Sequence, residues 1–160
     1  MTISRRVIKF FPILLIPLTA FIISRWYFQL MLIQGKSMEP TYHSNQLVFL
    51  NKQSDVYNIG DVVAFHSDSL NSILVKRIVA APGDRIFLIE NQLYVNDKAY
   101  YDCQWDIAYT DSEEILLNEN EYFMVGDNFD ESIDSRDSRV WLVNKDDLIG
   151  IVIPNKTYNK

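Results

Sequence analysis

Hydrophobic and polar positions divide the chain into two parts with different patterns. Near the N-terminus, residues 10–23 form an apolar stretch without a charged side chain. Beyond residue 30, apolar positions come in short runs between turn-forming residues, and no long stretch keeps the period of a helix. The short runs predict β-strands at residues 29–34, 46–51, 61–66, 73–80, 85–89, 92–96, 121–125 and 148–153.

Turn-forming residues separate several of these predicted strands. Residues 81–84, Ala-Pro-Gly-Asp, have the composition of a turn, and residues 90–91 are short enough for a tight hairpin. Residues 100–120 have the weakest pattern and are interpreted as a long loop or a small cap. The sequence therefore predicts an all-β fold, compact and barrel-like, in one domain that covers residues 29–160.

The apolar N-terminal stretch predicts a membrane anchor. A bilayer needs about 20 apolar residues, and residues 7–28 supply this length with Lys9 and Arg25 near the two ends. More basic residues precede the stretch than follow it, and within residues 1–28 no acidic residue occurs. This bias predicts that residues 1–6 lie in the cytoplasm and that the following domain lies outside.

A cleaved secretory signal is the competing interpretation of the same stretch. Cleavage after Ala20 would place Leu18 where a small residue is wanted, and the apolar character continues beyond that point. We therefore favour an anchor that stays attached.

Charge and the scarcity of metal-binding residues exclude several classes of function. The 160 residues include 15 Lys and Arg against 21 Asp and Glu, and the basic excess is confined to the N-terminus. An acidic domain is a poor partner for nucleic acid, which needs clustered cations. Cys103 is the one cysteine, and His43 and His66 are the only histidines, both expected at the surface or in ordinary packing. We expect no metal and no cofactor.

Two residues far apart in the sequence could form a nucleophile and its base. Ser37 lies in the segment Gly-Lys-Ser-Met-Glu-Pro-Thr at residues 35–41, and Lys76 lies in an apolar run at residues 73–79. A serine needs a base, and burial among apolar side chains lowers a lysine pKa enough for it to serve. Arg77 points to the other face of the same predicted strand, so we expect a surface or salt-bridge role for it.

Four blocks of residues, in order along the chain, resemble the type I (leader) signal peptidases. The blocks are Ser-Met-Glu-Pro-Thr, Gly-Asp-Val-Val-Ala-Phe, Lys-Arg-Ile-Val-Ala-Ala-Pro-Gly-Asp, and Gly-Asp-Asn followed by Ser-Ile-Asp-Ser-Arg, at residues 37–41, 60–65, 76–84, 126–128 and 132–136. The short distance between the third and fourth blocks is similar to compact Gram-positive members. The resemblance implies a coiled β-fold whose catalytic strands also bind the substrate.

The resemblance also implies roles for residues near the proposed nucleophile. Ser37 would attack the scissile carbonyl, and Lys76 would act as general base. Met38 would pack on the lysine and help to wall the pocket for the substrate residue before the cut. The backbone N–H of Ser37 is a candidate oxyanion donor, and Gly35 stands where some members carry a second, serine donor.

The last block would support the site. In the first of two possible registers, a serine that hydrogen-bonds the lysine is followed by a bracing acid and arginine; with Asp127 from Gly-Asp-Asn, these are Ser132, Asp134 and Arg136. The pattern Ser-x-Asp-Ser-Arg occurs twice in overlap, so Ser135, Asp137 and Arg139 form the alternative register. Phe129 departs from the family, which usually has arginine there.

The implied activity is that of a membrane-bound serine endopeptidase. Its partners would be precursor proteins with N-terminal signal peptides, the lipid bilayer and, as a candidate, the secretion translocase. Precursors would bind as an added strand and be cut after small residues at Ala-x-Ala sites, outside the cell membrane. The alternative from another class is a non-catalytic accessory factor for pilus or surface-protein assembly. A self-cleaving repressor is disfavoured because no helix-turn-helix pattern precedes the domain.

Overall fold

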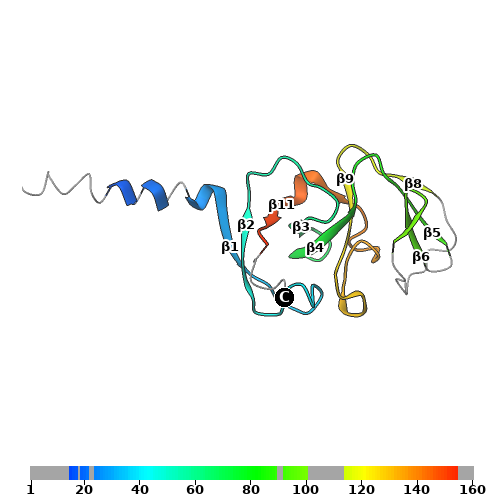
Figure 1. Cartoon of the computed structure of the whole chain (residues 1–160), viewed down its shortest axis with the longest axis horizontal. Helices are drawn as coiled ribbons and strands as arrows, with labels where there is room; N and C mark the ends of the chain where they lie inside the picture. Colours follow the sequence, from blue (N-terminus) through cyan, green and yellow to red (C-terminus); the bar gives the residue numbers. More distant parts are fainter. Residues whose placement is uncertain (1–14, 18, 22–23, 90–91, 101–113, 155–160) are drawn as a thin grey trace, which may run out of the picture.

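The computed structural model describes residues 15–17, 19–21, 24–89, 92–100 and 114–154. Residues 15–17, 19–21 and 24–27 are helical and lead into the first strand (Figure 1). Within this described part, no helix combines the length and the apolar character that a membrane crossing requires. Much of the predicted anchor at residues 7–28, the predicted turn at 90–91 and Cys103 lie outside the described residues.

Two antiparallel sheets make up the domain. The larger sheet has seven strands in the order β1-β2-β11-β3-β4-β9-β10, and the smaller has four in the order β7-β6-β5-β8. The larger sheet consists of β1 (Phe28–Leu32), β2 (Leu47–Asn51), β11 (Leu148–Val152), β3 (Val62–Ser67), β4 (Ser72–Ala80), β9 (Glu121–Val125) and β10 (Val143–Asn144). The smaller sheet consists of β7 (Lys98–Tyr100), β6 (Gln92–Val95), β5 (Arg85–Ile89) and β8 (Ile115–Leu116). Two short 3-10 helices, η1 (Phe129–Glu131) and η2 (Lys145–Asp147), complete the described elements.

The predicted all-β class is confirmed, and each predicted strand is found within one or two residues of its expected bounds. The short strands β7, β8 and β10 were not predicted, because two or three residues are too few to show alternation. The barrel-like closure is not found in the described part of the chain. There β1 and β10 are the two edges of the larger sheet, and β10 is only two residues long.

Three hydrophobic clusters fill the interior. The cluster between the two sheets joins Val79 and Phe123 of the larger sheet to Ile86 and Leu93 of the smaller. The other two clusters lie on opposite faces of the larger sheet, because successive residues of a strand point to opposite sides. Neighbouring residues of β3 illustrate this: Val63 belongs to one cluster and Ala64 to the other, and both are completely buried.

The register of the larger sheet fixes the position of the two basic residues on β4. Lys76 lies opposite Val63 of β3, and Arg77 lies opposite Val125 of β9. Because β4 has a neighbour on each side, its middle cannot shift without breaking hydrogen bonds to both. This strand is therefore a rigid support for its side chains.

The loop between β1 and β2 carries Ser37 and is closed by its own backbone. Ile33 donates to the carbonyl of Gln46 at 2.9 Å, and Asn45 donates back to the carbonyl of Ile33 at 2.8 Å. A further backbone bond fastens the loop to the larger sheet, because Asn128, just beyond β9, donates to the Ser37 carbonyl at 3.0 Å. The loop and the end of β9 are thus held together at Ser37.

Candidate active site

Ser37 and Lys76 meet where the β1–β2 loop crosses β4. The Lys76 amino group donates a hydrogen bond of 2.7 Å to the Ser37 hydroxyl oxygen. Ser37 is half-buried and remains reachable from solvent, whereas Lys76 is only 2% exposed. The two residues predicted as nucleophile and base are therefore in direct contact, with the serine on the outer side.

Burial sets the protonation of Lys76. It lowers the pKa of the Lys76 ammonium from 10.5 to about 8, because a charge is poorly solvated in the interior. Nearby Asp134 raises this pKa, Arg136 lowers it and Asp127 raises it, each less than burial lowers it. With a pKa of about 8, roughly a tenth of the amine is neutral at pH 7. A buried lysine with this pKa can accept a proton near neutral pH.

A buried carboxylate organises the segment that follows η1. Asp134 is fully buried and accepts hydrogen bonds from the Gly126 N–H at 2.9 Å, from Ser132 Oγ at 2.5 Å and from Arg136 Nε at 2.8 Å. A second Arg136 nitrogen, Nη2, also donates to Asp134 at 2.8 Å. The arginine compensates the carboxylate charge, as a buried acid requires. This network joins the segment to the end of β9.

The expected hydrogen bond from the Ser132 position to the lysine is not found. Ser132 Oγ donates to Asp134, and among the described residues the partner of the Lys76 amino group is Ser37 alone. The Ser132 hydroxyl donates instead to the carboxylate of Asp134, two residues away. A carboxylate binds a hydroxyl more strongly than a neutral acceptor does.

The two overlapping Ser-x-Asp-Ser-Arg patterns lie in different environments. Arg136 of the first pattern is 7% exposed and paired with a completely buried acid. Arg139 of the second pattern forms its ion pair with Asp137 at the surface, where its side chain is 53% exposed. Ser135, common to both patterns, is buried and binds the backbone of Met124. The first register is thus the one whose acid and arginine lie beside Gly126, and their roles stay predictions.

Gly126 lies where three segments meet. A Cβ atom at this position would lie 2.5 Å from the Ser37 carbonyl oxygen and closer still to Ser132 Oγ. These contacts are shorter than non-bonded atoms tolerate, so only glycine fits without displacing the loop of Ser37 or the segment of Ser132. The lack of space for a Cβ atom therefore explains why the first residue of the Gly-Asp-Asn block is glycine.

Arg77 forms a salt bridge, one of the two roles expected for it. Its Nε and Nη2 donate to the two carboxylate oxygens of Asp127 at 2.7 and 2.6 Å, a bidentate pair. Nη1 donates to the Gly60 carbonyl at 2.7 Å, and Nη2 lies 3.4 Å from Thr41 Oγ1. Sequence reasoning missed this junction, although it joins all four predicted blocks: Thr41, Gly60, Arg77 and Asp127 each belong to one of them.

Two further predicted positions are occupied by packing side chains. Met38 is 1% exposed and belongs to a buried cluster with Tyr42, Leu50 and Ala64, so in this structure it is part of the core. Phe129, where the family usually has arginine, places its ring 5.2 Å from the guanidinium carbon of Arg136. Its carbonyl also accepts a hydrogen bond from Arg136. The substrate-binding role of Met38 stays a prediction.

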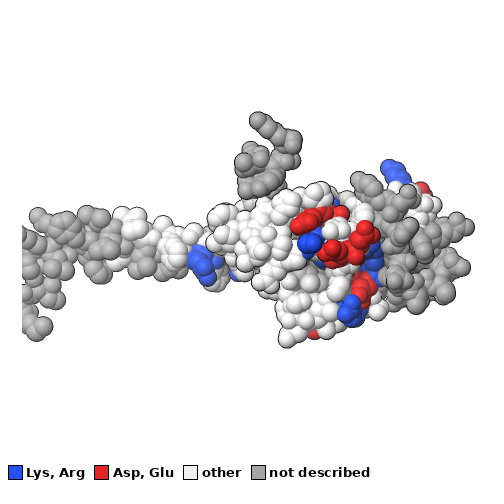
Figure 2. Space-filling view, turned by 90° about the horizontal axis from the view of Figure 1, so that it is seen from below, with Lys and Arg blue, Asp and Glu red and all other residues white. Residues whose placement is uncertain are grey.

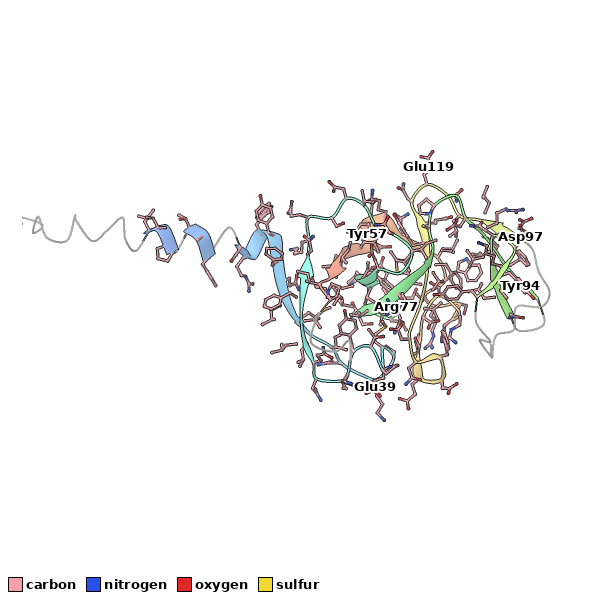
Figure 3. All side chains as sticks on the ribbon, viewed as in Figure 1. Glu39, Tyr57, Arg77, Tyr94, Asp97 and Glu119 are labelled. Carbon is pink, nitrogen blue, oxygen red and sulfur yellow. The ribbon has the colours of Figure 1, made fainter. Side chains whose placement is uncertain are left out.

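A pocket of about 290 Å³ lies next to this site. Its lining comes from the β1–β2 loop, β4, β7 and the end of β9, and consists of Thr41, Arg77, Val79, Tyr100, Val125, Gly126, Asp127 and Phe129. Arg77 lies near the middle of the domain (Figure 3). The sequence did not predict this pocket, because its walls come from segments far apart in the chain.

The two histidines each lie beside a carboxylate of their own. His66 pairs with Asp68 at 3.0 Å, and His43 lies 3.8 Å from Glu39; both histidines are about half exposed at the surface. Within the residues that the structure describes, no three His, Cys, Asp or Glu side chains are grouped so as to hold a metal ion.

Comparison with known proteins finds signal peptidases. Residues 4–154 match the family described as signal peptidase, peptidase S26. Signal peptidase I P of Bacillus subtilis subsp. natto is 29% identical over 153 residues, which cover 87% of this chain and 82% of that protein. Signal peptidase I S of Bacillus subtilis (strain 168) is 32% identical over 132 residues, which cover 73% of this chain and 71% of that protein.

A crystal structure of a signal peptidase I from Enterococcus faecalis V583 is also similar. It has a TM-score of 0.45 and 19% identity, with 62% of this chain and 98% of that chain covered. The match over residues 4–154 and the Bacillus relatives are sufficient: the chain belongs to the signal peptidase family, peptidase S26, as a type I signal peptidase and thus a serine peptidase.

Proposed function

We propose that this signal peptidase uses Ser37 as nucleophile and Lys76 as general base, and that it cuts membrane-held precursors after small residues. The proposal rests on one observation above all, the 2.7 Å contact between a half-buried serine hydroxyl and a buried lysine amine. A nucleophile and its base need this distance, and the base needs a pKa near the working pH. The depressed pKa of Lys76 supplies the second condition.

In the proposed reaction, neutral Lys76 takes the proton of the Ser37 hydroxyl while the oxygen attacks the scissile carbonyl. The tetrahedral intermediate collapses when the lysine ammonium gives its proton to the leaving amine, which becomes the new N-terminus of the mature protein. The signal peptide stays on Ser37 as an ester. Water then attacks the ester with Lys76 again as base, and the serine hydroxyl is restored.

The backbone N–H of Ser37 is the proposed oxyanion donor. Among the described residues it has no hydrogen-bond partner of its own, so it is available to a developing negative charge. Gly35 has no side-chain hydroxyl to act as a second donor, and its φ of +84° lets the loop turn two residues before the nucleophile.

Ser132, Asp134, Arg136 and Asp127 are proposed to support the site without touching the substrate. The Asp134 network holds Gly126, and Gly126 contacts the backbone of Ser37. Positioning of this kind matters because a small displacement of the nucleophile costs a large factor in rate.

An apolar surface supports the proposed membrane attachment. One face of the β1–β2 hairpin exposes large apolar side chains, and two cross-strand pairs, Leu30 with Phe49 and Leu32 with Leu47, lie on it. Trp26, just before β1, is 74% exposed. Acidic and basic side chains gather on one part of the surface in Figure 2, whereas the part nearest the N-terminal segment is mostly free of them. A bilayer surface accepts such a face, and Ser37 lies only five residues beyond the end of β1.

The nucleophile assignment is tested with Ser37→Ala. We expect this variant to lose cleavage of a precursor with an Ala-x-Ala site, because no oxygen remains to attack the carbonyl. Thermal unfolding should stay close to that of the wild type, since Ser37 is half-buried and small. Retained cleavage would contradict the assignment. A folded wild-type protein that cuts none of several precursors would instead favour the non-catalytic assembly factor.

The base assignment predicts a pH dependence. Raising the pH deprotonates the Lys76 ammonium and so creates the base, which means that kcat/KM rises as pH increases through about 8. Between pH 7 and pH 9 we expect an increase of about tenfold. Lys76→Arg should be inactive throughout, because a guanidinium is not deprotonated at these pH values. A flat profile, or an active arginine variant, would rule out Lys76 as base.

The two overlapping patterns provide a matched pair of variants. Arg136→Ala leaves the buried Asp134 carboxylate without its cation, and we expect it to destabilise the fold by about 3–5 kcal/mol and to lower activity. Arg139→Ala removes a solvent-exposed ion pair and should leave both the unfolding midpoint and activity near wild type. Thermal unfolding and precursor cleavage measure both effects. The reverse order of effects would assign the second register.

Membrane attachment is tested on the full chain expressed in cells. We expect the protein to stay in the membrane pellet after alkaline extraction, and a protease added from outside to digest the domain beyond residue 28. Recovery in the supernatant would contradict the anchor. Protection of the domain from external protease would contradict the predicted orientation.

A further inference from the structure

We propose that Arg77 is a positioning residue, which holds the strand of Lys76 and the segment around Ser37 at the separation that their contact needs. The proposal rests on the proposed roles of Ser37 and Lys76 and adds a residue to them. Successive residues of a strand point to opposite faces, so Arg77 points away from Lys76. It therefore acts through its neighbours and touches neither the substrate nor the reacting atoms.

The backbone pairing between β4 and β9 ends just before the site. Arg77 lies opposite Val125, and Val125 is the last residue of β9. Residues 126–128 follow outside the strand, yet they are the ones that meet the loop of Ser37. A link other than sheet hydrogen bonds must therefore fix residues 126–128 relative to β4.

The ion pair of Arg77 and Asp127 supplies this link. Nε and Nη2 of Arg77 donate to the two carboxylate oxygens of Asp127 at 2.7 and 2.6 Å. Two parallel hydrogen bonds fix the direction of the contact as well as its length. The Arg77 side chain is 27% exposed and the Asp127 side chain 14%, so water competes with this pair less than with a pair at the surface.

Each partner of the ion pair is next in the chain to a residue that bears on the site. Arg77 follows Lys76 directly. Asp127 precedes Asn128, whose backbone N–H donates to the Ser37 carbonyl at 3.0 Å. A shift of Asp127 relative to β4 would therefore move Ser37 relative to Lys76.

The remaining nitrogen of Arg77 holds the guanidinium itself in place. Nη1 donates to the Gly60 carbonyl at 2.7 Å, and the Gly60 N–H donates to the Ile78 carbonyl at 2.9 Å. The turn before β3 is thus bound both to the guanidinium and to the strand that carries it. Because of this second attachment, Arg77 cannot swing outward with Asp127 and acts as a fixed bracket.

Arg139 provides a matched control for the chemistry of the pair. It binds Asp137 through the same two nitrogens, Nε and Nη2, but at the surface, where its side chain is 53% exposed. Removal of either arginine costs one cation and one bidentate pair. Only Arg77 lies beside the strand of Lys76.

The experiment measures kcat and KM separately for the full-length protein in detergent with an Ala-x-Ala precursor. We expect Arg77→Ala to lower kcat by roughly a hundredfold, since a nucleophile misplaced by about 1 Å costs a factor of this size. KM should change by no more than about twofold, because Arg77 does not touch the substrate. Arg77→Lys keeps the charge without the fork and should remain roughly tenfold below wild type in kcat. Arg139→Ala should match wild type.

Rescue by methylguanidinium separates positioning from a general loss of stability. Arg77 is partly exposed and lines the pocket of about 290 Å³, so a small cation can reach the space that Arg77→Ala leaves beside Asp127. We expect methylguanidinium to raise kcat of Arg77→Ala about tenfold, whereas methylammonium, which has the charge without the fork, should not. Neither cation should change kcat of wild type or Arg139→Ala.

A second set of variants covers the case in which Arg77→Ala does not fold. Asp127→Asn, Arg77→Gln and the double variant remove the pair from either side and from both. If the pair works as a unit, the double variant loses no more kcat than the worse single variant, and losses that simply multiply would overturn the proposal.

Two further results would overturn the positioning role. One is a kcat within about twofold of wild type in folded Arg77→Ala. The other is a low kcat that methylguanidinium raises no more than methylammonium does. Cleavage by Ser37→Ala would instead overturn the proposed function, so the two failures can be told apart.

Discussion

One lysine amine kept out of water beside a serine hydroxyl is the contact on which the rest of this structure depends. An ammonium in the interior is costly, and the cost is what brings the pKa of Lys76 down to about 8. Lys76 lies on a strand with neighbours on both sides and with clusters of apolar side chains around it. The packing and hydrogen bonds of this sheet offset the free energy that burial of the ammonium costs. The proposed Ser-Lys mechanism needs no histidine, and the two histidines of the chain lie at the surface.

The charges around the lysine change its pKa less than burial does. Asp134 would hold the ammonium charged if its negative charge were uncompensated, and Arg136 binds it through two nitrogens. Asp127 is neutralised in the same way by Arg77. Each acid near the amine thus has its own arginine, so that burial is the strongest influence on Lys76.

Much of this site could be predicted from the sequence because its members lie in short blocks with strong local patterns. Ser37 and Lys76 were predicted as partners from residue chemistry and from the resemblance to signal peptidase blocks, and the structure brings them into contact. The strands were predicted because alternation and turn residues are local signals. Strands of two or three residues, the open edges of the sheet and the partner of Ser132 were missed, because each is decided by contacts between distant segments.

Gly126 has a consequence at the level of the gene. Every amino acid other than glycine carries a Cβ atom, and at this position that atom has no room between the loop of Ser37 and the segment of Ser132. A missense change in its codon therefore inserts a wedge between two parts of the chain that are more than ninety residues apart. Any such change must therefore displace the Ser37 backbone or the Ser132 side chain.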